Sequence, residues 1–149
     1  MNYFINSESA QRRQERDRLL TELYCEIYDQ LKPKQVKNPK RVALAIALET
    51  GTPPYHVSYE RARVVVLRLL ASDNSANFKS SANRDMWLDL TKKVKCLMEQ
   101  GKMSAARAIA IVIEQCRASR FFLTPEHAWS IIKQQLSHMN CRRPYGRVA

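Results

Sequence analysis

The histidines and cysteines are the residues of this chain whose types could bind a metal or activate a nucleophile. Three histidines and four cysteines are present, without a HExxH motif or a C-x-x-C pair. His138 and Cys141 could share one helical face, and Cys116 or His127 could join them. Scattered Cys and His in helical sequence are more often structural or exposed than metal ligands. We therefore expect reduced thiols, no metal site and no cofactor.

The glycines and the acidic residues offer no catalytic chemistry either. Gly51, Gly101 and Gly146 stand alone, so the sequence contains no glycine-rich phosphate loop. Most acids lie beside bases at helical spacings, where surface ion pairing explains them. The sequence therefore predicts a protein without catalytic residues, one that is not an enzyme.

The net charge is the strongest chemical signal in the chain. The 149 residues include 25 Lys and Arg against 14 Asp and Glu, a formal charge of +11. Residues 1–75 contribute +3 and residues 76–149 contribute +8. Such a balance favours an anionic partner, first nucleic acid and then an acidic protein or an acidic membrane surface. A basic, solvated surface without a specific partner is the alternative.

The basic residues gather in two clusters and a tail. The predicted contacts to nucleic acid are Lys32, Lys34, Lys37, Lys40 and Arg41 (the first basic cluster), Lys92, Lys93, Lys95, Lys102 and Arg107 (the second basic cluster), and Arg142, Arg143 and Arg147 in the tail. Two clusters on one body can contact backbone phosphates at two places, and the tail can add a flexible arm. For each cluster, a solvated loop or the charge complement of a helix C-terminus is the alternative.

The two clusters fall at roughly equivalent positions of an internal duplication. At an offset of 66 residues, "RVALAIALETGTPPYHVSYERARVVVLRLL" (41–70) aligns without a gap on "RAIAIVIEQCRASRFFLTPEHAWSIIKQQL" (107–136). Both copies contain the phrase aromatic-x-aliphatic-hydroxyl-x-Glu-x-Ala, and the register continues upstream, where Leu20 and Tyr24 meet Met86 and Leu90. Chance similarity between two amphipathic stretches is the alternative. The duplication predicts an all-α fold of two tandem three-helix units.

Helix signals and polar breaks predict the boundaries of these units. We expect a first unit over residues 1–71 with a charged, solvated N-terminal helix extension, a polar linker over 72–83, a second unit over 84–138, and a basic tail over 139–149. The expected helix starts are Ser7 or Ser9 for the first helix, Asn38 with Pro39 for the second, Ser104 for its counterpart, and Asn83 for the helix after the linker. The second helix, "RVALAIALE", is apolar nearly all round and should be buried centrally.

The stretch "PPYHVSYERA" (53–62) bears on whether the protein carries a helix-turn-helix. In the duplicate copy, "SRFFLTPEHA" (119–128), the letters "TPE" are a strong helix start, which moves the start of the equivalent helix in the first copy to Ser58. Residues 50–57 then become an extended connector, longer than the turn of about three or four residues that a helix-turn-helix has. We expect units that resemble a helix-turn-helix but have this longer connector, with Tyr55 and Phe121 packed under the helices.

These two stretches also carry a resemblance to known proteins. "PPYHVSYERA" with "SRFFLTPEHA" resembles a motif in small, uncharacterised helical proteins of Bacteroides-type bacteria and of their phages or mobile elements. The resemblance covers little more than the two stretches. It implies a phage or mobile-element context and no activity.

Three functions are compatible with these features. The first is a non-enzymatic protein that binds nucleic acid, DNA more than RNA, through backbone phosphates. The second is a structural or adaptor protein of a phage or mobile element that acts through a protein partner or as a homo-oligomer. The third is a helix-turn-helix transcription regulator, with Arg61, Arg63 and Arg68 reading bases. No apolar run is long enough to span a membrane, and the N-terminal residues lack the basic start and uninterrupted apolar stretch of a secretory signal, so we expect a cytoplasmic protein without membrane contact.

Overall fold

Helices form the secondary structure of this protein. The computed structural model describes residues 2–71, 78 and 80–140. Its elements are α1 (Asn2–Leu31), the short 3-10 helix η1 (Lys32–Lys34), α2 (Pro39–Thr50), α3 (Tyr59–Ala71), α4 (Ser81–Gly101), α5 (Ala105–Gln115) and α6 (Pro125–Asn140). Over the described residues there is no strand, only an isolated bridge between Pro54 and Arg117. The predicted all-α class is confirmed.

Several helices begin at the residues that the sequence marks. The hydroxyls of Ser58, Ser104 and Thr124 each accept a hydrogen bond from the backbone N–H three residues on, at 3.1, 3.3 and 3.2 Å. Such a bond satisfies one of the amides that the first turn of a helix leaves without a partner. Pro39 begins α2 as predicted, but the side chain of Asn38 makes no cap hydrogen bond because its backbone is left-handed, with φ 51°.

The first half of α1 differs from the expectation of a capped, solvated extension. The helix begins at Asn2, so Ser7 and Ser9 lie inside it rather than at its start. Ser9 is buried and donates a hydrogen bond to the carbonyl oxygen of His56 at 2.8 Å. Arg16 is only 6% exposed, and its Nη1 lies 3.3 Å from His56 Nε2. Contact with the segment around His56 therefore covers part of this polar half-helix, which the sequence period alone could not show.

The start of α4 and the burial of α2 are also corrected. Helix α4 begins at Ser81, and Ser80 is its cap, accepting a hydrogen bond from the Asn83 amide at 3.1 Å, so Asn83 donates rather than caps. Helix α2 is buried along one face only, and Ile46 is 37% exposed. The reason is that α2 packs mainly against α1 and α6, which leaves its other side to solvent.

Two hydrophobic cores hold the helices together, and each takes helices from both predicted units. The α1 core lies between α1, α2 and α6, and its buried members are Leu20, Tyr24, Ala43, Leu44, Ala47, Leu48, Phe121, Leu123, Ala128, Ile131 and Ile132. The α4 core lies between α3, α4 and α5, and its buried members are Tyr55, Ala62, Val65, Val66, Leu69, Met86, Trp87, Leu90, Val94, Ala108, Ile109, Val112, Ile113 and Ala118. The third helices are thus exchanged: α6 joins α1 and α2, and α3 joins α4 and α5.

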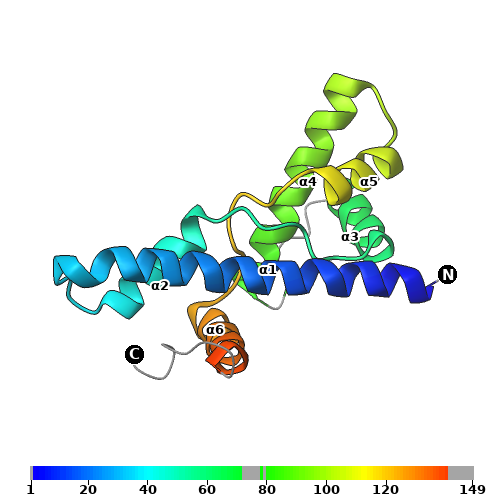
Figure 1. Cartoon of the computed structure of the whole chain (residues 1–149). Helices are drawn as coiled ribbons and strands as arrows, with labels where there is room; N and C mark the ends of the chain where they lie inside the picture. The colour runs from blue at the N-terminus through cyan, green and yellow to red at the C-terminus, as the bar shows by residue number, and fades with distance from the viewer. Residues whose placement is uncertain (1, 72–77, 79, 141–149) are drawn as a thin grey trace.

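This exchange corrects the predicted division into a unit over residues 1–71 and a unit over 84–138, because neither stretch contains a whole core. It arises where two connectors cross, the first connector (residues 51–58) and the second connector (residues 116–124), which Figure 1 shows running together through the middle of the molecule. The Ala118 amide donates to the Pro53 carbonyl at 2.8 Å, and the Phe121 amide donates to the Leu48 carbonyl at 3.0 Å. The crossing sends Tyr55 into the α4 core and Phe121 into the α1 core.

The exchange also excludes a helix-turn-helix made of α2 and α3, since these two helices belong to different cores.

Part of the predicted linker, residues 72–77 and 79, lies outside the described residues. The duplication itself stays a prediction from the sequence.

Candidate nucleic-acid interface

The first basic cluster surrounds the turn between α1 and α2. Gln35 and Asn38 both adopt left-handed backbone, with φ 54° and 51°, and so reverse the chain within a few residues after η1. All five basic side chains of the cluster are exposed. Lys32 places its ammonium 5.4 Å from the centre of the Tyr28 ring, a cation–π distance. Among the described residues, no acid forms an ion pair with any member of the cluster.

Aromatic side chains fix the helices behind this turn. The rings of Tyr24 and Tyr28 stack at 5.9 Å between centroids, and Trp129 of α6 meets Tyr24 edge-on at 5.6 Å. Burial and the neighbouring Tyr28 raise the pKa of Tyr24 to about 12, so its hydroxyl stays neutral. The first basic cluster is therefore carried by a packed end of the α1 core.

The second basic cluster lies on α4 and at the turn between α4 and α5. Lys92, Lys95, Lys102 and Arg107 are exposed, and Lys102 has left-handed backbone, with φ 48°, where α4 ends. Figure 1 shows this turn far from the α1–α2 turn, one at the upper right of the molecule and the other at its left end. The structure thus places four of the five residues at the surface, well separated from the first cluster.

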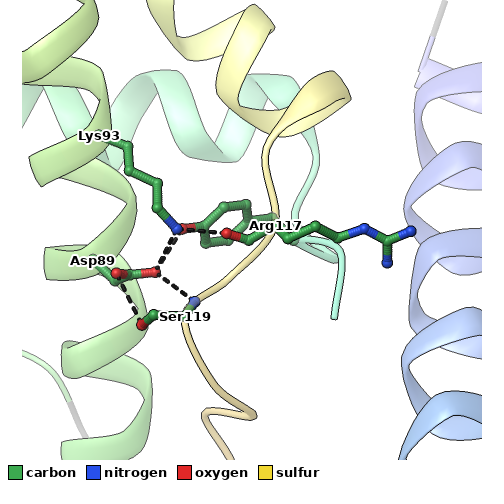
Figure 2. Close-up of polar contacts among 5 residues, drawn as sticks. Asp89, Lys93, Arg117 and Ser119 are labelled. Carbon is green, nitrogen blue, oxygen red and sulfur yellow. Dashed lines mark hydrogen bonds and ion pairs between the residues drawn. The ribbon is translucent and has the colours of Figure 1, made fainter. Parts of the chain in front are cut away.

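Lys93 is the exception, because its side chain is half-buried and its ammonium is hydrogen-bonded to other groups of the protein. It donates hydrogen bonds to the Tyr55 hydroxyl at 2.7 Å, to Asp89 Oδ2 at 3.3 Å and to the carbonyl oxygen of Arg117. Figure 2 shows the amino group enclosed by these partners between α4 and the second connector. All three of its protons are used, so Lys93 is removed from the interface.

Asp89 is the centre of this arrangement, which we call the polar joint (Tyr55, Asp89, Lys93, Ser119 and the Arg117 carbonyl). Asp89 accepts hydrogen bonds from the Tyr55 hydroxyl at 2.6 Å, from the Ser119 hydroxyl at 3.1 Å and from the Ser119 amide at 3.3 Å. Burial alone would raise the pKa of Asp89, but the bond from Tyr55 and the charge of Lys93 outweigh it and lower the pKa. Burial, and then the bond to Asp89, raises the pKa of Tyr55.

One weak signal for this joint is present in the sequence, and the other contacts leave none. Asp89 and Lys93 stand four residues apart on a helix, the spacing of a surface ion pair. Their partners Tyr55 and Ser119 are 34 and 30 residues away from Asp89, on the two connectors. Every polar group of the joint is hydrogen-bonded to another group of the joint. Its role is therefore structural: it holds the two connectors against α4 and leaves no reactive group free.

The histidines do not come together as ligands. His56 is held against Arg16, and its pKa falls to about 4, chiefly through burial and then through the charge of Arg16. With His127, these residues line a pocket of about 180 Å³, but the Arg16 guanidinium is already paired with Asp17 at 2.8 Å. Within the described part of the chain, no three His, Cys, Asp or Glu side chains are placed to hold a metal ion.

Some of the predicted residues fall outside what the structure describes. The tail arginines Arg142, Arg143 and Arg147 lie there, as does Cys141. On α3 the three arginines named for base readout, Arg61, Arg63 and Arg68, are exposed. None of the helices that the structure describes combines the length and apolarity needed to cross a membrane.

Comparisons of the chain with models of protein families, with curated proteins and with solved structures give no match. A function can therefore be inferred only from the exposed charges and surfaces of this chain.

Proposed function

We propose that this protein is a non-enzymatic nucleic-acid-binding protein that contacts backbone phosphates, with DNA preferred over RNA. The contacts are the first basic cluster and the exposed members of the second, Lys92, Lys95, Lys102 and Arg107. The observation that carries the proposal is the turn between α1 and α2, where five exposed cations lie together without an acidic partner among the described residues.

The charge and the length of these side chains support the proposal. A duplex carries closely spaced phosphates, and each lysine or arginine that neutralises one releases condensed counterions to the solution. Long side chains on a short turn can reach neighbouring phosphates of the backbone without contacting the bases. Because the two clusters are far apart (Figure 1), one molecule can engage phosphates at two separate places.

Fluorescence anisotropy of the protein with unrelated duplex DNA, single-stranded DNA and RNA, at several salt concentrations, tests the proposal. The variant with Lys34, Lys37, Lys40 and Arg41 changed to Ala should bind every sequence more weakly. Its slope of log K against log salt should flatten by as much as about 3–4, since up to four phosphate contacts are lost.

A matched control removes four exposed cations elsewhere, by changing Arg13, Arg18, Arg63 and Lys133 to Ala. The control has the same net charge as the test variant and should keep most of the affinity. Equal weakening in both variants would show that net charge acts without a site. Absence of binding by the unchanged protein at low salt would overturn the proposal.

A second candidate function is that of a structural or adaptor protein in a phage or mobile element. The observation that favours it is an exposed apolar surface on α3, where Val64 is 51% and Leu67 is 41% exposed. Exposed apolar side chains that cluster on one face often mark a contact with another protein.

A further inference from the structure

A groove on α1 combines an apolar floor with an acidic rim, on a protein that is otherwise basic. It has a volume of about 450 Å³, and its floor includes Leu19, Leu23 and the ring of Phe121. Glu22 and Glu26 of α1 line it and are both exposed. The exposed Arg117 also lines it, but its guanidinium is paired with Glu15 at 3.5 Å, so the two glutamates give the rim its acidic character. Among the residues that the structure describes, Glu22 pairs with Arg18 alone, in an exposed pair at 3.3 Å, which contributes little because both charges are solvated.

Helix α3 carries a ridge of the opposite character. Val64, Leu67 and Ala71 are all exposed, and their i, i+3 and i+7 spacing places them along one line of the helix. By the same geometry, Arg61 and Arg68 border this line on one side and Arg63 on the other. The exposed Glu60, four residues before Val64, continues the line toward the start of α3, so the ridge has three cations against one acid. No acid pairs with these three arginines among the residues that the structure describes.

We propose that the α3 ridge of one molecule docks in the α1 groove of a second copy of this chain. The two surfaces match in both respects that matter. Apolar Val64 and Leu67 meet an apolar floor, and Arg61 and Arg68 meet the carboxylates at the rim. Burial of the apolar groups supplies affinity, while the charges set orientation and exclude wrong partners.

The two surfaces of a single molecule cannot meet each other. Helix α3 is fixed in the α4 core, and Figure 1 shows it near the N-terminal end of α1, whereas the groove residues belong to the C-terminal half of α1. The contact joins two different patches, so it is heterologous and leaves one free ridge and one free groove on each pair. Repetition of the same contact produces a ring or an open chain of molecules.

Sedimentation velocity over a range of micromolar concentrations, at low and high salt, tests this contact on the full chain. The unchanged protein should associate beyond the monomer, and less so at high salt because the rim pairs are exposed. A ridge-reversed variant (Arg61→Glu with Arg68→Glu) and a groove-reversed variant (Glu22→Arg with Glu26→Arg) should each associate at least about tenfold more weakly.

The decisive sample is an equal mixture of the two reversed variants. In the mixture, glutamates on one ridge face arginines on the other groove, so association should return. All four positions are exposed, so circular dichroism should show unchanged helix content in each variant. A general loss of folding cannot produce recovery on mixing.

Two results would overturn the proposal. One is an unchanged protein that stays monomeric at every concentration and salt; if its ridge-reversed variant also loses nucleic-acid binding, the ridge faces nucleic acid instead. The other is a mixture that stays monomeric. The variant of the first basic cluster should associate normally, so the two proposals can fail separately.

Discussion

The two connectors cross at one place in the molecule, yet they are fastened to their cores by different chemistry. The first connector inserts Tyr55 into the α4 core, where its hydroxyl meets Asp89 and Lys93. The second connector inserts Phe121 into the α1 core, where its ring lies over Gly51 and next to Leu23. In the predicted 66-residue register, Tyr55 corresponds to Phe121 and Asp89 to Leu23. The first connector is held by polar contacts. The second is held by close packing of apolar groups at a site that we call the apolar joint (Phe121, Gly51 and Leu23).

The difference explains how each connector finds the correct core. A tyrosine in the apolar joint would bury a hydroxyl without a partner, and a phenylalanine in the polar joint would leave Asp89 and Lys93 short of one. Either misplaced side chain therefore raises the free energy of a fold in which the connectors enter the wrong cores. Two similar connectors on one chain therefore need unlike joints, because like joints would permit α3 and α6 to change places.

Truncation of the apolar joint should have the largest effect. Phe121→Ala removes a ring that is only 1% exposed and leaves a cavity between α1 and the connectors. We expect a loss of about 3–5 kcal/mol in the free energy of unfolding. Denaturation with guanidinium chloride, followed by circular dichroism, measures it.

Gly51 provides the control for this effect. A Cβ at Gly51 would lie 2.0 Å from the Phe121 ring, so Gly51→Ala should destabilise the unchanged protein by about 1–3 kcal/mol. In the Phe121→Ala background the same change should be nearly neutral, because the obstructing ring is gone. Strictly additive losses in the double variant would contradict the contact.

Breaking the polar joint should have the next largest effect. Asp89→Ala leaves Lys93, the Tyr55 hydroxyl and the Ser119 groups without their shared acceptor. Since Asp89 is partly exposed, with 17% of its side chain accessible, water offsets part of the loss. We expect about 2–3 kcal/mol of destabilisation by the same denaturation measurement.

The polar joint can also be replaced by the residues that occupy the equivalent positions around the apolar joint. The triple variant Tyr55→Phe, Asp89→Leu, Lys93→Ile copies Phe121, Leu23 and Ile27. It should lose less stability than Asp89→Ala alone, because no polar group of these three is left unpaired. A triple variant less stable than Asp89→Ala would show that the α4 core cannot accept the apolar joint.

Local features of the fold follow from the sequence, and the exchange of helices does not. The caps at Ser58, Ser104 and Thr124 depend on residues within one turn, so patterns detect them. The partition of α3 and α6 depends on which core receives Tyr55 and which receives Phe121. Both pairings satisfy the same hydrophobic periodicity, so a one-dimensional pattern cannot separate them.

In the candidate interface, too, local features can be predicted from the sequence and tertiary contacts cannot. Exposure of the first basic cluster is predictable, since its lysines lie among prolines and polar residues between two helices. The role of Lys93 is not, because its sequence neighbours Lys92 and Lys95 are exposed while two of its three partners come from the two connectors. A basic run identifies charge, but only tertiary contacts decide which charges remain available.

The smallest expected effect is a pH dependence confined to the first connector. His56 lies there, and its counterpart in the second connector, Phe122, does not titrate. Burial first, and then Arg16, Arg13 and His127, lower the pKa of His56 to about 4 from 6.5. The unfolded chain therefore binds more protons than the folded one below pH 6.5. The contribution to stability is complete above that pH and is lost as the pH falls toward 4.

Between pH 7 and about pH 5.5 the loss should be about 1 kcal/mol, which urea denaturation at each pH can resolve. Asp89 acts in a separate window, because a carboxylate with a lowered pKa keeps its contribution until the pH falls below the unfolded value of 3.8. His56→Phe copies the second connector, so its stability should change less over this range than that of the unchanged protein. An equal slope in both proteins would show that His56 does not cause the pH dependence, and the two connectors would then be alike in their response to acid.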